Sequence, residues 1–123
     1  MKKKLKYVTI AMTFLLLSCK KHDFVEFIIR DISQPMYFID SVSALHGIQH
    51  NNVSVIITGD VDSSARIDYA SYPKNHGAGF YEITKGRVEI KSQWDYYSGD
   101  TIWIKFTPKG TQKGFLKIKT RIN

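Results

Sequence analysis

Alternation of apolar and polar side chains governs most of the chain after residue 50. The segment "DTIWIKF" (100–106) shows the pattern, with Ile102, Ile104 and Phe106 on one face and Trp103 and Lys105 on the other. Successive side chains of a β-strand point to opposite faces, so a period of two residues is typical of strands with one buried face. No window longer than eight residues after residue 18 carries a helical stripe. The pattern therefore predicts an all-β chain.

Seven or eight short strands are expected, separated by turn residues such as glycine and proline. They are "FVEFIIR" (24–30), "MYFID" (36–40), "VSVIITGDV" (53–61), "ARIDY" (65–69), "GFYEI" (79–83), "RVEIKSQW" (87–94), "TIWIKF" (101–106) and "FLKIKTRI" (115–122). Strands of this number and spacing indicate a two-sheet antiparallel β-sandwich, immunoglobulin-like in general shape, with a small β-barrel as the alternative. Residues 24–123 are predicted to form this single domain.

The last three expected strands allow a more specific prediction. If residues 87–94, 101–106 and 115–122 pair in sequence as a meander, their outward side chains form one surface. The basic and aromatic residues of that surface are Trp103, Lys91, Lys105, Lys117, Lys119 and Arg121, with Glu89 as the one acid among them. Such a surface favours an anionic partner. The alternative is a solvated face on which lysine stems cover the indole.

A second candidate binding element is the aromatic turn "WDYYSGD" (94–100), which carries Tyr96 and Tyr97. Aromatic side chains in sandwich loops offer a large contact area at low entropic cost, which suits sugars or protein partners. The alternative is that Trp94 fills the core and one tyrosine pins a corner of the sandwich.

The first nineteen residues follow a different pattern. Residues 1–6 carry four lysines and no acid, and residues 8–17 ("VTIAMTFLLL") carry no charge. Ten helical residues span about 15 Å, half of a hydrocarbon core of ~30 Å, so this run is too short to cross a membrane. A basic segment, a short apolar segment and small residues after it are typical of a secretory signal peptide.

Leu16-Leu17-Ser18-Cys19 ends that segment with the single cysteine of the chain. These residues resemble the lipobox of bacterial lipoproteins, and the resemblance covers residues 1–19 only. It implies that residues 1–18 are removed and that Cys19 carries a diacylglyceryl group and an amide-linked chain such as palmitate. An ordinary signal peptide with an incidental cysteine is the alternative. A lone thiol in an oxidising compartment is otherwise a liability, which favours lipidation.

The resemblance also implies where the protein is held. Residues 19–23 form a short lipidated tether, and the domain is anchored to a membrane of the bacterial cell envelope. In some bacteria an acidic run after the lipidated cysteine marks export to the cell surface. Here Lys20 and Lys21 stand in that position, so we expect a periplasm-facing anchor.

Charge argues against binding to nucleic acid. The whole chain has a formal net charge of +7, but four of its lysines lie in residues 1–6. From Cys19 onward, 14 lysines and arginines face 11 acidic residues, a net charge of +3. The basic balance therefore belongs largely to the signal segment.

No residue pattern in the sequence indicates a catalytic or metal site. The chain has no Gly-x-Ser-x-Gly nucleophile elbow. His46 and His50 have the i, i+4 spacing of zinc ligands, but Gly47 disfavours the helix that would bring them together. Residues 60–71 match a calcium loop only at its first three ligand positions. We expect no catalytic residue, no metal and no cofactor.

These features favour a non-enzymatic, lipid-anchored binding module of the envelope that contacts a protein or a glycan. Inhibitors, immunity factors and accessory lipoproteins all fit that description. The alternatives are a structural component of envelope assembly and a small periplasmic hydrolase. The oligomeric state is left open.

Replacing Cys19 with alanine should release the protein from membranes without unfolding it, because Cys19 lies outside every expected strand. Membrane fractionation of cells producing Cys19→Ala tests this, with immunoblotting to confirm that the signal peptide has been removed. A processed variant that stays in the membrane fraction would contradict lipidation.

Overall fold

Eight β-strands make up the part of the chain that the structure describes. The computed structural model describes residues 23–42, 52–70, 79–95 and 101–123. In chain order the strands are β1 (Val25–Ile29), β2 (Met36–Ser41), β3 (Asn52–Val61), β4 (Ser64–Ala70), β5 (Gly79–Ile83), β6 (Gly86–Asp95), β7 (Thr101–Lys109) and β8 (Gly114–Ile122).

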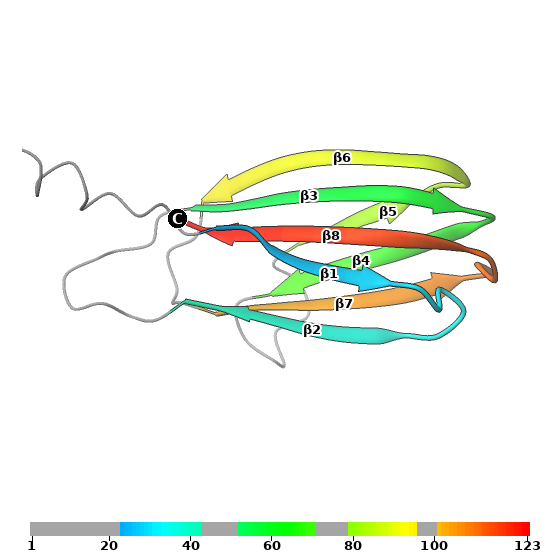
Figure 1. The fold of residues 1–123 in the computed structure, drawn as a ribbon, viewed down its shortest axis with the longest axis horizontal. Coiled ribbons are helices and arrows are strands. Elements are labelled where there is room, and N and C mark those ends of the chain that lie inside the picture. Colours follow the sequence, from blue (N-terminus) through cyan, green and yellow to red (C-terminus); the bar gives the residue numbers. More distant parts are fainter. Residues whose placement is uncertain (1–22, 43–51, 71–78, 96–100) are drawn as a thin grey trace, which may run out of the picture.

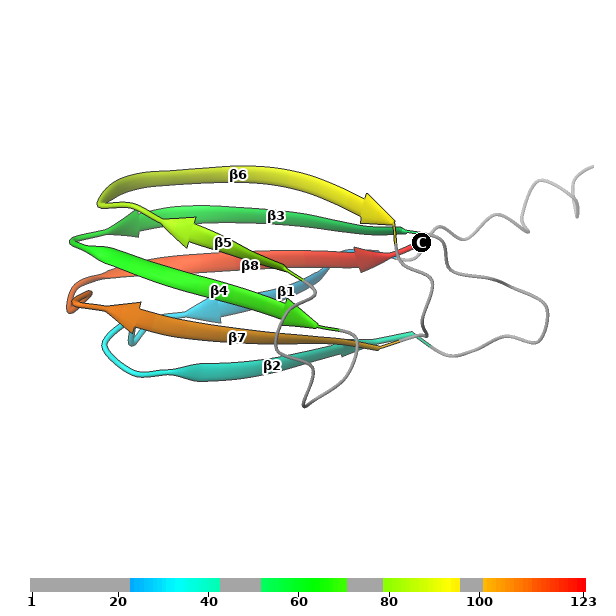
Figure 2. The same ribbon diagram turned by 180° about the vertical axis from the view of Figure 1, so that it is seen from behind.

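The strands form two antiparallel four-stranded sheets packed face to face (Figures 1 and 2). Sheet A has the order β1-β8-β3-β6, and sheet B has the order β2-β7-β4-β5. The predicted two-sheet antiparallel sandwich is confirmed, and the sheets do not close into the alternative barrel. Only the step from β4 to β5 stays within one sheet, and every other step passes to the opposite sheet. This connectivity is that of a jelly roll.

The meander predicted for the last three strands is wrong. β7 lies between β2 and β4 in sheet B, whereas β6 and β8 both pair with β3 in sheet A. Alternation determines which face of a strand is buried, but strands with the same pattern are interchangeable as pairing partners. Alternation therefore does not predict the order of the strands within each sheet.

The predicted burial is correct for the five strands whose inward faces were assigned, β3, β4, β6, β7 and β8. The side chains predicted to point inward on β3, β7 and β8 are all buried, and those on β4 and β6 are buried or half-buried. Aromatic pairs join the two sheets, since the rings of Phe27 and Phe38 lie 4.9 Å apart and Tyr69 stacks on Trp94 at 4.1 Å. Trp94 is therefore packed against the core, as the alternative for the aromatic turn anticipated.

The two ends of the sandwich differ in their connections. Asp23 and Asn123 lie at one end, which we call the terminal end, and Asn123 exchanges backbone hydrogen bonds with Asn52 there. The opposite end holds the described turns. At one of these, the Asp62 carboxylate accepts a hydrogen bond of 2.9 Å from the backbone N–H of Gln112. That contact ties the β3–β4 turn to the β7–β8 turn.

One strand ends later than expected. The strand was predicted over residues 101–106, but β7 continues to Lys109, and Gly110 then takes the left-handed φ of 94°. Pro108 is tolerated inside β7 because the pairing with β2 ends at Phe106, so one edge of β7 has no strand beside it there.

Two isoleucines on neighbouring strands of sheet B test the assignment of faces. Ile104→Ala should lower the free energy of unfolding by about 2–5 kcal/mol, because this buried side chain would leave a cavity. Ile39→Ala should cost less than about 1 kcal/mol, because Ile39 points outward and is 50% exposed. Denaturant unfolding of both variants measures the difference. Equal losses would mean that the faces are reversed.

Candidate functional site

The structure divides the predicted basic surface between two opposite faces of the sandwich. Lys91, Lys117, Lys119 and Arg121 alternate with buried residues of sheet A and lie on its outer face. Trp103 and Lys105 lie on the outer face of sheet B. The prediction that all these side chains surround Trp103 is therefore wrong. The cause is the placement of β7 in the other sheet.

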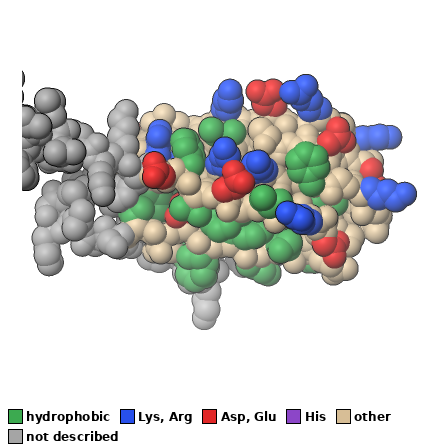
Figure 3. Space-filling view, viewed as in Figure 1, with side chains coloured by type: hydrophobic (Ala, Val, Ile, Leu, Met, Phe, Trp, Pro, Cys, Tyr) green, Lys and Arg blue, Asp and Glu red, His purple; other side chains and the backbone are tan. Residues whose placement is uncertain are grey.

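The outer face of sheet A is mixed in charge, as Figure 3 shows. Lys117 and Lys119 both lie near the Glu26 carboxylate of β1, at 3.6 and 3.5 Å. Lys91 lies 3.9 Å from Glu89. Exposed pairs of this kind contribute little to stability, typically under ~1 kcal/mol each. Glu26, which the predicted meander did not include, nevertheless offsets part of the positive charge of Lys117 and Lys119. The outer face of sheet A is therefore less positive than the predicted surface.

The outer face of sheet B carries four large apolar side chains. Tyr37 is 69% exposed, Ile39 is 50% exposed, and Ile39 pairs across the ladder with Trp103. On the far edge of the sheet, Phe80 is 51% exposed, and Lys105 and Asp68 lie between it and Tyr37 in the same row. We call the four apolar residues the aromatic face. Adjacent outward-facing apolar side chains, here Tyr37, Ile39 and Trp103, are typical of contact sites.

Two cations are held against rings of the aromatic face. The Arg66 guanidinium lies 3.9 Å from the centre of the Phe80 ring, and the Lys105 ammonium lies 5.6 Å from the centre of the Tyr37 ring. A cation over the face of an aromatic ring is attracted by the π-electrons, and at exposed sites such a contact contributes about 0.5–1 kcal/mol. Each edge of the aromatic face therefore carries a cation beside a ring.

An ionic network borders the aromatic face on the Phe80 side. Arg66 donates to Asp68 at 2.9 Å and lies 3.7 Å from Glu82. The Lys109 ammonium reaches both carboxylate oxygens of Glu82 at 3.2 Å. A polar rim around an apolar centre is the usual anatomy of a protein-binding surface.

Sequence reasoning missed three of the four members of this surface. In "MYFID" both faces of the strand are apolar, so alternation cannot tell whether Tyr37 and Ile39 or Met36 and Phe38 point inward. The pairing of β2 with β7 would have identified these residues, because it places the outward side chains of β2 beside Trp103. Phe80 was missed because its segment was predicted only as a further strand, with no face assigned.

Tyr96, Tyr97 and Cys19 lie outside the described residues, so their predicted roles stay predictions. Within the described ranges no three His, Cys, Asp or Glu side chains lie together as a metal site would require. The same ranges contain no helix that is long and apolar enough to span a membrane.

A buried carboxyl joins the two sheets behind the aromatic face. Asp40 of β2 points inward, and the hydroxyl of Thr120 on β8 donates a hydrogen bond to it. Burial raises the pKa of Asp40 above its ordinary value, although the hydrogen bond from Thr120 opposes the shift. The sequence pattern assigned Asp40 neither to a face of this strand nor to a partner.

Comparison with known proteins identifies no family. No protein-family model matches the chain, and no curated protein matches it. A solved structure that is similar is the coat protein of Tobacco streak virus, with 8% identity and a TM-score of 0.37 over 85% of this chain and 91% of that one. A likeness at this level carries no inference about function.

Asp40→Asn should change how stability depends on pH. With its pKa raised in the folded state, wild-type Asp40 favours folding most below the unfolded pKa, and this contribution is lost as pH rises through the folded pKa. Asparagine stays neutral and can still accept the Thr120 hydroxyl. The variant should therefore unfold at similar denaturant concentrations to wild type near pH 3 and at higher ones near pH 7. Parallel pH profiles of the two proteins would contradict the assignment.

Proposed function

We propose that the protein is a lipid-anchored binding module of the bacterial envelope that contacts a protein partner through the aromatic face. The observation that carries this proposal is the grouping of Tyr37, Ile39 and Trp103 on one outer face, with Tyr37 and Ile39 at least half exposed. Tyrosine, tryptophan and arginine are the residues that dominate binding energy at protein interfaces.

A protein is favoured over a glycan by the mixture of side chains. Ile39 is an aliphatic group on the edge strand β2, opposite Trp103, and it offers neither a ring for stacking nor a hydrogen bond to a sugar hydroxyl. The neighbouring Arg66, Asp68 and Glu82 form an ordered network of both charge signs. Such a rim selects a partner by charge complementarity.

The proposed anchor is compatible with this surface. Cys19 precedes Asp23 by four residues, which reach at most about 14 Å when extended. The domain would therefore sit close to the membrane, with its terminal end facing it. The long axis of sheet B runs away from that end, which leaves the aromatic face open to a partner beside the molecule (Figure 2).

Site-specific photo-crosslinking in the producing cell tests the proposal. A benzophenone amino acid at Tyr37 or Phe80 should yield a discrete protein adduct. The matched control is the same probe at Phe115, an equally exposed phenylalanine (50%) on the outer face of sheet A. Protease digestion of the adduct identifies the partner as protein, and resistance to protease would indicate a glycan instead. Adducts from Phe115 alone, or from none of the three positions, would overturn the proposal.

A second variant links the adduct to the apolar patch. Ile39→Lys should abolish the crosslink from Tyr37 while leaving the unfolding midpoint almost unchanged, because residue 39 points to solvent. A persistent crosslink at wild-type yield would show that the patch does not contribute to the contact.

A further inference from the structure

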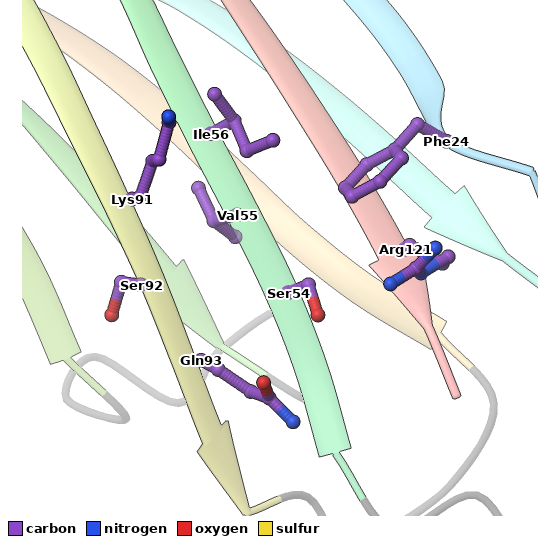
Figure 4. A pocket seen from close by; sticks show the side chains of 8 residues that line it. All are labelled: Phe24, Ser54, Val55, Ile56, Lys91, Ser92, Gln93 and Arg121. Atoms are coloured by element: carbon purple, nitrogen blue, oxygen red, sulfur yellow. The ribbon is translucent and has the colours of Figure 1, made fainter.

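A hollow of about 310 Å³ lies on the outer face of sheet A at its terminal end (Figure 4). Its outward-pointing lining residues are Phe24, Ser54, Ile56, Lys91, Gln93 and Arg121. The ladder register places Arg121, Ser54 and Gln93 in one row across β8, β3 and β6. The volume is at the lower limit of small-molecule sites.

Arg121 is the distinctive group of this hollow. Its guanidinium lies 4.4 Å from the centre of the Phe24 ring, and its Nε is buried without a hydrogen-bond partner. Among the described residues, no carboxylate lies within ion-pair distance of Arg121, whereas Lys117, Lys119 and Arg66 all have one. A buried donor left unpaired is costly, so an acceptor placed at the Nε–H of Arg121 would be stabilised.

The other polar groups around the hollow are also donors or can act as donors. Lys91 forms only the loose 3.9 Å pair with Glu89, and Gln93 carries an exposed amide. The Ser54 oxygen accepts a hydrogen bond of 3.3 Å from the Asn123 amide, which leaves its own O–H available to donate. None of the described residues that line the hollow is an aspartate or a glutamate. The lining therefore suits a ligand with several acceptor oxygens and negative charge.

We infer that this hollow binds a phosphate group, held by the Arg121 fork and Lys91, with Ser54 and Gln93 donating to the remaining oxygens. A planar guanidinium matches two phosphate oxygens at once, and its stacking on Phe24 reduces the entropy lost on binding. The phosphate belongs either to a membrane lipid headgroup or to a soluble phosphorylated molecule. Only the lipid source depends on the proposed anchor, because that anchor would hold the terminal end at the membrane.

The Nε–H resonance of Arg121 provides a direct readout by nuclear magnetic resonance. The full-length protein, labelled at arginine nitrogen and held in a neutral detergent without phosphate, is titrated with inorganic phosphate against sodium chloride of equal ionic strength. A second sample is incorporated in nanodiscs that contain phosphatidylglycerol. A saturable shift with free phosphate supports a soluble ligand, and a shift only in the nanodiscs supports a lipid headgroup.

Matched variants distinguish specific phosphate binding in the hollow from a general effect of ions on surface charges. Arg121→Gln removes the reporting resonance, so its binding is followed at the backbone N–H of Ser54 in uniformly labelled protein. The variant should bind at least about tenfold more weakly, because a charge-assisted hydrogen bond is lost. Arg87→Gln, at an exposed arginine on the same outer face, should leave it unchanged. If Arg121→Gln fails to fold, Lys91→Gln at an exposed position should still weaken binding severalfold. The inference is overturned if neither probe gives a saturable shift at Arg121, or if sodium chloride or Arg87 responds equally.

Discussion

A single apolar layer between the two sheets holds the described domain together. Every strand except β2 contributes at least one buried apolar side chain to it, and β2 adds the half-buried Met36 and Phe38. The chain has one cysteine, so no disulfide within it can supplement this layer. Burial on one face of each strand therefore decides which side chains remain outside. Both candidate binding surfaces consist of those remaining side chains.

The faces of the strands could be predicted from sequence, whereas their partners could not. The period of two residues correctly places Ile57, Ile104 and Ile118 inside, because a strand in a sandwich must bury one face. The same period does not indicate which strands are neighbours in a sheet. Trp103 was therefore expected among the lysines of β8, although it lies on the opposite side of the molecule. Glu26 was overlooked for the same reason, since its role depends on β1 being the neighbour of β8.

Individual side chains were hardest to assign where a strand is apolar on both faces. Tyr37 and Phe38 are adjacent and similar in size, yet one is among the most exposed residues and the other packs on Phe27. Only the identity of the neighbouring strands separates them. Asp40 shows the opposite case, because a polar residue on an inner face gives no hint of its partner until Thr120 is brought opposite from eighty residues away.

The two outer faces have different chemistry, and the core separates them. Both faces carry ion pairs, but sheet A presents the hollow around Arg121, whereas sheet B presents the aromatic face. Packed sheets lie about 10 Å apart, so ligands on the two faces would not touch each other. A molecule built in this way can hold a phosphate-bearing group on one side and a protein on the other, as the two proposals require.

The central position of β8 has a consequence for the order of folding. β8 lies between β1 and β3, so sheet A is complete only after β1 has paired with β8, for example Val25 with Thr120. Until the last strand has been synthesised, β1 has no partner within its sheet and one edge of β3 is unpaired. Pairings between such distant parts of a chain form slowly, typically in milliseconds to seconds. A sheet that is completed only when the last strand arrives leaves the chain unfolded for longer, which would suit the secretion that the proposed lipid anchor requires.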